Sequence, residues 1–463
     1  MQLAALLRTK TINADHVHHQ GELRRVLGPI DLTLLGIGAI IGAGIFVLTG
    51  VAAATQAGPS IILSYAVAGI ACTFSALAYA ELAAAVGGCG SAYGYSYAGL
   101  GELVAWIIGW DLILEYGVAT AAVAIGWSSY VNNALSAMGL ALPELLTKTP
   151  VQGGWINLPA ALIVLILAFL LSLGVRESVR VNTIMVVVKL LAITLFIGVA
   201  LSHIEPANWT PFMPFGWEGV MGGAAVIFFA YIGFDAVSTA AEEARNPQRD
   251  LPIGILLSLG ICTLIYIIVA GLLTLVVAYP TLNVGSPVAD VMLRLGYPWA
   301  AGLVATGAIA GLTTVMLVLY YGLTRVFLAM SRDGLLPPVF ARVHSKTRTP
   351  IRVIMVSGVL MAAIAGFTPI SDVAELVNIG TLAAFFLVCI GVVMMRRSHP
   401  DLPRPFLSPG APIVPLLGAL SCLFLMVNLS AITWLRFGIW LALGLVIYFA
   451  YSRYHSSLAT VSE

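Results

Sequence analysis

The sequence predicts an all-α integral membrane protein of twelve transmembrane helices, of which the first and sixth are broken. Hydrophobic residues fill 60% of the 463 positions and charged residues only 9%, whereas about a quarter of the residues in a soluble domain are charged. The apolar residues gather in segments of about 17 to 25 residues, the length at which a helix crosses a bilayer. A transmembrane β-barrel would instead show short segments of alternating polarity, and the sequence contains none.

Twelve apolar segments follow one another without a long linker, so we expect one transmembrane domain over residues 27–450. The flanking segments 1–26 and 451–463 are expected to be cytoplasmic tails, and the first lacks the apolar core of a cleavable signal peptide. The approximate limits of the expected spans are 30–52, 58–86, 102–136, 156–175, 182–203, 219–241, 252–278, 299–327, 351–367, 372–395, 411–430 and 432–450.

Basic residues lie almost entirely on one side of the expected membrane. If the N-terminus is cytoplasmic, eighteen of the 22 lysine and arginine residues fall on the inner side, and only Lys148, Arg294 and Arg436 fall on the outer side. The positive-inside rule therefore predicts that both termini are cytoplasmic. We expect the protein in the inner (plasma) membrane of the cell. Topology and anionic lipid account for the basic loops, and a net charge of +1 gives no indication of nucleic-acid binding.

The cysteine and histidine residues do not indicate a cofactor or a metal site. The five cysteines are widely separated, so neither a disulfide framework nor a zinc site is expected. Segment 15–19 (DHVHH) is interpreted as part of a flexible tail with chance histidines. No histidine lies at mid-span, and the H-E-x-x-H and G-x-S-x-G motifs are absent. We therefore expect a protein that is not an enzyme and carries no cofactor.

The first span is interrupted by glycines. Segment 35–46 (LGIGAIIGAGIF) is apolar enough for lipid but contains four glycines within nine residues. A break in a membrane helix leaves backbone groups unpaired, at a cost of several kcal/mol each in hydrocarbon unless protein, ligand or water pairs them. The alternative is close helix packing, for which Gly38 and Gly42 have the small-xxx-small spacing. The glycine density favours an unwound segment, and therefore a binding site.

A second break is predicted in the sixth span, at segment 228–235 (FFAYIGFD). The two broken spans open successive groups of five, which form repeat one at about 30–203 and repeat two at about 219–395. The last two helices, 411–450, lie outside the repeats. Inverted repeats whose broken helices meet near the bilayer midplane are typical of secondary transporters.

These two segments, together with Glu242, Glu243 and the step from Asn246 to Pro247, resemble the amino acid–polyamine–organocation (APC) superfamily. Within it, the sequence is similar to bacterial members of the cationic amino acid transporter family over about residues 27–450. The resemblance implies the LeuT-like fold of the sodium-coupled neurotransmitter transporters, an amino acid substrate, and alternating access as the mechanism.

An unwound helix presents the two poles that an α-amino acid needs. The N–H groups that begin a half-helix suit the carboxylate, and the carbonyl groups that end the other half suit the ammonium. We assign the carboxylate to the amides around Ala43 and Gly44, and the resemblance implies contacts at the same positions. Phe229 is a candidate gate over bound substrate. The expected substrate-binding residues in the two breaks are Ile40, Ile41, Gly42, Ala43, Gly44, Phe229, Ala230 and Ile232.

Lys189 lies in the middle of the fifth span. An ionisable side chain at mid-membrane is costly and by default marks a functional site, so we expect Lys189 to exchange a proton during transport. The resemblance implies that its ammonium stands where sodium-coupled relatives hold a sodium ion, which favours proton coupling. The alternative is a permanently charged strut against carbonyls of the first span.

Several carboxyl groups are also predicted within the membrane. Asp111 and Glu115 lie on one face of the third span because they are four residues apart. Glu115, the deeper one, senses the substrate ammonium through water or exchanges protons; a neutral, hydrogen-bonded packing role is the alternative. Asp235 follows the second break and either caps the half-helix or pairs with a cation, and it joins Lys189 and Glu115 as a proton-coupling candidate. Glu81 is interpreted as a solvated or loop-bonded carboxylate.

The eighth span is expected to line the side-chain end of the pocket through Thr313, Thr314, Met316 and Leu319, and the resemblance singles out Leu319. Leucine there restricts the volume, and apart from Glu115 no carboxylate is left to neutralise a cationic substrate. We therefore expect proton-coupled import of small or medium neutral amino acids such as alanine. The alternative is a cationic amino acid or polyamine transporter or exchanger.

Other classes of membrane protein fit the sequence less well. A channel requires a continuous polar lining, and the spans carry few polar stripes. A substrate sensor of the same fold stays open as an alternative. Amino acid, protons and membrane lipid are the expected partners.

Overall fold

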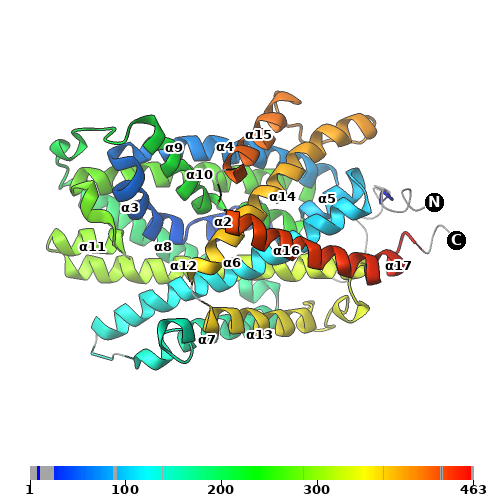
Figure 1. The fold of residues 1–463 in the computed structure, drawn as a ribbon, viewed down its shortest axis with the longest axis horizontal. Coiled ribbons are helices and arrows are strands. Elements are labelled where there is room, and N and C mark those ends of the chain that lie inside the picture. Colours follow the sequence, from blue (N-terminus) through cyan, green and yellow to red (C-terminus); the bar gives the residue numbers. More distant parts are fainter. Residues whose placement is uncertain are drawn as a thin grey trace.

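The computed structural model describes residues 8–10, 25–86, 91–137, 139–140, 142–284, 286–368, 370–427, 429 and 431–459. The histidine segment 15–19 and Cys89 lie outside these residues. Within the described chain the regular elements are helical, and the only β pairing is an isolated bridge between Leu27 and Ala244. Eight helices among the described residues are long and apolar enough to cross a membrane. The predicted all-α membrane class is confirmed (Figure 1).

The described chain contains α-helices joined by short 3₁₀ and π-helical turns. The α-helices are α2 Pro29–Ile40, α3 Thr49–Ala52, α4 Ile61–Ala85, α5 Ala92–Gly99, α6 Glu102–Ala137, α7 Leu158–Leu173, α8 Val175–Leu201, α9 Gly216–Ile227, α10 Pro247–Val276, α11 Pro287–Arg294, α12 Pro298–Arg332, α13 Ile351–Phe367, α14 Ile370–Ser398, α15 Ile413–Val427, α16 Ala431–Ile447 and α17 Arg453–His455. The other turns that matter for the site are η2 Gly44–Leu48, η8 Phe228–Tyr231 and η9 Asp235–Glu243.

The expected spans coincide in position with these helices. The apolar stretch Pro29–Ala85 covers the first two spans and contains a turn at Gly58, whose φ of +63° favours glycine. The shorter apolar helices α7, α13 and α15 coincide with the fourth, ninth and eleventh spans. Two short helices, α5 and α11, form in segments that the sequence predicts as connections. The number of membrane crossings and the inverted relation of the repeats stay predictions.

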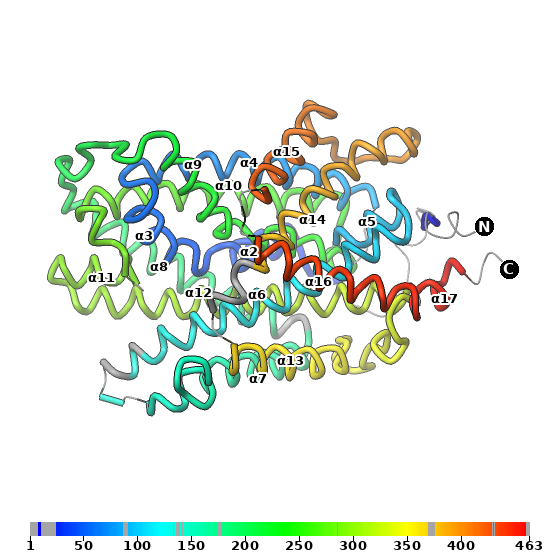
Figure 2. The backbone as a smooth tube through the Cα atoms, viewed as in Figure 1, coloured from blue at the N-terminus to red at the C-terminus, as the bar shows by residue number. Residues whose placement is uncertain are grey.

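The centre of the bundle is built by α6 and α12, which pack against each other (Figure 1). α14 also packs on α6, α8 on α12, and α10 on both α2 and α4. The tube in Figure 2 shows α15 at the upper edge of the bundle. Large apolar side chains face outward, among them Leu191 on α8, 64% exposed, and Leu435 on α16, 63% exposed. Exposed apolar surface of this kind suits contact with lipid.

The structure breaks the first span at the predicted segment. α2 ends at Ile40, and Ile41 is extended, with φ −77° and ψ 99°. The chain becomes helical again at Gly44, where η2 begins.

The sixth span breaks in a similar way. α9 continues into η8, the backbone becomes extended at Ile232 with ψ 136°, and η9 follows from Asp235. Gly233 has φ +114°, a conformation that favours glycine. A Cβ atom on Gly233 would lie only 2.9 Å from the Cβ atom of Ala39 in α2. Glycine at this position therefore permits both the break and the approach of the two broken helices.

Candidate functional site

The two breaks are in direct contact. A Cβ atom on Gly44 would lie 2.2 Å from the Cβ atom of Ala230, closer than real side chains approach. A Cβ atom on Gly42 would lie 2.5 Å from the nearest methyl group of Val315 in α12. By contrast, a Cβ atom on Gly36 would lie 2.3 Å from the Ser258 side chain, and one on Gly38 would lie 2.4 Å from the Asn182 side chain, so these glycines permit close helix packing. The glycine cluster therefore has two roles, one in packing and one at the junction of the breaks.

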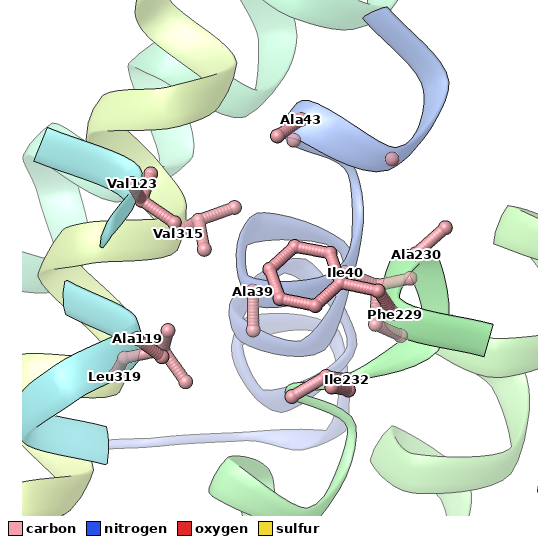
Figure 3. A pocket seen from close by; sticks show the side chains of 12 residues that line it. Ala39, Ile40, Ala43, Ala119, Val123, Phe229, Ala230, Ile232, Val315 and Leu319 are labelled. Atoms are coloured by element: carbon pink, nitrogen blue, oxygen red, sulfur yellow. The ribbon is translucent and has the colours of Figure 1, made fainter. Parts of the chain in front are cut away.

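A pocket lies at this junction, between the breaks and the helices α6 and α12. Its unfilled volume is about 20 Å³, which is room for about one water molecule. The ring of Phe229 points into this space (Figure 3). The lining residues are Ala39, Ile40, Gly42, Ala43, Gly44, Ala119, Val123, Phe229, Ala230, Ile232, Val315 and Leu319. Seven of the eight predicted backbone contacts are in this set, and Ile41 is not.

The backbone at one end of the pocket suits a carboxylate. Gly42, Ala43 and Gly44 line the pocket where η2 begins. The first N–H groups of a helix have no partner within the helix and carry the positive end of its dipole. An anionic group is therefore stabilised at this end of the pocket.

The carbonyl groups at the breaks are bridged by Tyr266 of α10. Its buried hydroxyl lies 2.7 Å from the carbonyl oxygen of Ile40 and 2.9 Å from that of Ala230. Each carbonyl oxygen has two lone pairs and can accept a second hydrogen bond, for example from an ammonium group. Sequence reasoning missed Tyr266, and the only local signal for it is a tyrosine within an apolar span.

Lys189 is held by the first broken helix. Its Nζ atom donates to the carbonyl oxygens of Ile37 at 2.9 Å, Gly38 at 3.1 Å and Ile41 at 2.8 Å, and to the Thr314 hydroxyl at 2.9 Å. The side chain is fully buried, and no carboxylate in the described chain forms an ion pair with it. Ile41 thus belongs to the lysine site through its carbonyl group. The geometry suits both a charged strut and a proton-exchanging group.

The carboxyl groups of Glu115 and Asp235 do not line the pocket. Glu115 lies one helical turn before Ala119, which does line it, and neither oxygen of Glu115 has a hydrogen-bond partner. Asp235 accepts a hydrogen bond from the Tyr116 hydroxyl. Both side chains are fully buried. Glu115 on α6 and Asp235 on η9 therefore lie beneath the pocket and not in its wall.

The contribution of α12 to the pocket differs from the expected one. Leu319 lines it as predicted, and so does Val315, which sequence reasoning missed. Thr314 points to Lys189, and Thr313 accepts a hydrogen bond from the Trp127 side chain at 2.9 Å. These threonines and Met316 are absent from the pocket wall, because only residues four apart on α12 face it.

Ion pairs join the helices at the ends where the sequence predicts the cytoplasmic side. Glu243, in the motif after the second break, binds Arg325 of α12 at 2.7 Å, and both side chains are buried. Glu81 accepts two hydrogen bonds from Arg396, at 2.8 and 2.7 Å, and one from the amide of Ser408 at 2.8 Å. Glu81 is therefore a loop-bonded carboxylate, as the sequence suggested.

Comparison with known proteins agrees with this architecture. A family model described as amino acid permease matches residues 27–450. The branched-chain amino acid permease BcaP of Bacillus subtilis is 51% identical, over 98% of this chain and 99% of that protein. The methylthioribose transporter of Bacillus subtilis is 48% identical, over 98% of this chain and 100% of that protein. Human cationic amino acid transporter 4 is 32% identical, over 94% of this chain and 88% of that protein. The chain therefore belongs to the amino acid permease family of the APC superfamily, whose members are transporters and not enzymes.

Proposed function

We propose that this protein imports neutral L-amino acids with small or medium aliphatic side chains, in symport with protons, by alternating access across the inner (plasma) membrane. The observation that carries the proposal is the pocket at the junction of the two breaks, with backbone poles at one end and apolar side chains at the other. The proposed substrate of the protein is a zwitterion, and its other proposed partners are protons and membrane lipid.

The backbone poles favour an α-amino acid over a sugar. The start of η2 offers N–H groups to a carboxylate, while the carbonyls of Ile40 and Ala230 face the same junction and accept from an ammonium. Both charges of the ligand are then balanced by dipoles that folding has already placed. An uncharged thioribose would leave these poles without charged partners.

The side-chain end of the pocket favours a neutral substrate. Ala119, Val123, Val315 and Leu319 form this end, and no carboxylate lines it. A cationic side chain would be buried without a counter-ion, which is costly. The unfilled volume has room for about one water molecule, so Phe229 or Leu319 must move even for alanine, and must move further for larger substrates. The high identity to a branched-chain amino acid permease supports an aliphatic substrate.

A cationic amino acid or polyamine substrate is the second candidate. Glu115 is a buried carboxylate one turn from Ala119, and several relatives are cationic amino acid transporters. A long cationic side chain would have to pass Ala119 and Leu319 to reach it. This candidate therefore requires the pocket floor to open.

Proton coupling is assigned to Lys189, with Glu115 and Asp235 as further candidates. Sodium coupling is not favoured, because the Lys189 ammonium already binds the carbonyls of the first break that would coordinate a cation. Release of a proton from Lys189 would weaken these bonds and so couple protonation to the position of α2.

The test is uptake into proteoliposomes of labelled alanine, valine, leucine, arginine, putrescine and methylthioribose, with and without an inward proton gradient. Alanine and valine should accumulate only with the gradient, while counterflow should proceed without it. Competition by arginine or putrescine alone would support the second candidate, and gradient-independent accumulation would refute proton coupling. Preference for methylthioribose would refute the amino acid assignment.

A further inference from the structure

Buried polar atoms without a hydrogen-bond partner are concentrated in one region below the pocket. In the part of the chain that the structure describes, several buried side-chain atoms lack a hydrogen-bond partner. Six of them are the hydroxyls of Tyr79 and Tyr95, one oxygen each of Asp111 and Asp235, and both oxygens of Glu115. Such atoms are rare in folded proteins, and a group of them indicates bound water or an ion.

These residues face one another from several helices. Asp111 and Glu115 lie four residues apart on one face of α6, and the hydroxyl of Tyr116, next to Glu115 in the chain, donates a hydrogen bond to Asp235. The rings of Tyr79 and Tyr95 are 6.5 Å apart. We call the six residues the acid cluster: Tyr79 of α4, Tyr95 of α5, Asp111, Glu115 and Tyr116 of α6, and Asp235 of η9.

Two further elements close the acid cluster. From α14, the Thr381 hydroxyl faces Glu115, and Gly380 would place a Cβ atom 2.9 Å from Asp111 Oδ1. From η9, Ser238 faces Tyr95. No basic side chain of the described residues forms an ion pair with the three carboxyl groups. The cluster thus holds three acids and no counter-ion.

Three buried carboxylates in one region of a protein interior cannot all be charged without cations, because desolvation and mutual repulsion both oppose it. No group of residues in the described chain is suited to a metal ion. Protons are therefore the cations that fit, with water between the carboxyl and phenol groups. The Tyr79 and Tyr95 hydroxyls each donate one hydrogen and accept others, which suits a hydrated chain.

The acid cluster lies between the pocket and the predicted cytoplasmic side. Glu115 is one turn from the pocket residue Ala119, and Asp111 is one turn further toward the start of α6. Tyr95 belongs to α5, in the predicted inner connection. The Tyr116 to Asp235 hydrogen bond joins α6 to η9, the half-helix that follows the second break.

We propose that Asp111, Glu115 and Asp235 form a hydrated proton site that discharges to the cytoplasm when η9 separates from α6. Separation breaks the Tyr116 to Asp235 hydrogen bond and admits water. A carboxylic O–H bond then breaks, its electron pair stays on the carboxylate oxygen, and the proton passes to water. Asp111, outside the pocket and away from Lys189, is a positioning and storage group for this proton. The proposal rests on the proposed proton-coupled function.

The test compares wild type with Asp111→Asn, which keeps the shape but cannot release a proton. We expect counterflow within twofold of wild type, gradient-driven accumulation at least fivefold lower, and loss of a protonated-carboxyl band in infrared difference spectra after a pH step. Asp111→Glu should restore both signals. Asp290→Asn, the same change in the exposed pair with Arg294, should alter neither.

Each contrary result has a distinct meaning. Unchanged accumulation with an unchanged infrared band would overturn the acid cluster as a proton site. If Asp111→Asn also loses counterflow, the Asp111→Glu variant decides, since failure to restore accumulation in a folded protein would overturn the proposal. If wild type itself shows no gradient-driven accumulation, the proposed function fails, and the infrared band alone tests the cluster.

Discussion

The hydroxyl of Tyr266 lies 2.7 Å from the carbonyl oxygen of Ile40, at the residue where α2 ends. The same hydroxyl lies 2.9 Å from the carbonyl oxygen of Ala230 in the second break. One side chain from α10 therefore sets the spacing of the carbonyl groups to which we assign the substrate ammonium. This arrangement links the stability of the breaks to substrate affinity.

Tyr266→Phe should raise the KM for alanine about fivefold, because a typical hydrogen bond contributes about 1 kcal/mol. Initial-rate uptake in proteoliposomes measures this. Tyr320→Phe is the matched control, since its hydroxyl bonds the Ile354 carbonyl on α13, away from the pocket. An unchanged KM in Tyr266→Phe would show that the bridge does not affect binding.

Substitution of Lys189 separates proton exchange from a strut role. Lys189→Ala should abolish gradient-driven accumulation, because four hydrogen bonds to α2 and Thr314 are lost. Lys189→Arg keeps a charge that is never released. It should retain counterflow and lose accumulation if Lys189 exchanges the proton. Full accumulation by Lys189→Arg would identify a strut.

Leu319→Ala should shift the preference from alanine toward leucine. Removing the side chain enlarges the apolar end of the pocket, and a change of this size is worth about 1–3 kcal/mol in discrimination, or at least about tenfold in kcat/KM ratio. Competition assays with both amino acids measure the ratio. Leu317→Ala makes the same change on α12 outside the pocket wall and should leave the ratio unchanged.

The buried pair of Arg325 and Glu243 should make a large contribution to stability when one partner is removed. Arg325→Met leaves a buried carboxylate without its cation, which costs about 3–5 kcal/mol. The thermal unfolding midpoint in detergent should fall clearly. The double variant Arg325→Met with Glu243→Leu removes both charges and should recover most of the loss; an equally unstable double variant would indicate that packing dominates.

Tyr93 of α5 gives a testable pH dependence. It donates to Asp333 at 2.7 Å, and burial, followed by the charge of Asp333, raises the pKa of the Tyr93 hydroxyl well above 10.0. Because the folded-state pKa is raised, this stabilisation is complete below about pH 10, the unfolded pKa, and is lost as the pH rises further. Tyr93→Phe should remove part of the decline in unfolding free energy above pH 10, by up to about 1.4 kcal/mol per pH unit. Parallel curves for the two proteins would contradict this.

The helices and the breaks were predictable because their causes are local. Apolar segments of membrane length predict helices wherever they occur in the chain, and glycine density predicts where a helix unwinds. The segment around Gly42 and Gly44 and the segment around Gly233 each contain these signals within a few residues. The helix α5 was not predictable, since its glycines and tyrosines favour a turn and its helical form depends on packing against α6 and α14.

Local sequence determined that this protein is an all-α membrane protein with two unwound segments and a lysine at mid-span, because composition and backbone preference act on neighbouring residues. Tertiary structure alone decided that Tyr266 bridges the breaks. It also decided that Thr314 accepts a hydrogen bond from Lys189 instead of lining the pocket, and that Glu115 lies below the pocket wall. These relationships join residues far apart in the chain. They depend on the rotation and spacing of packed helices, which no single helix sequence specifies.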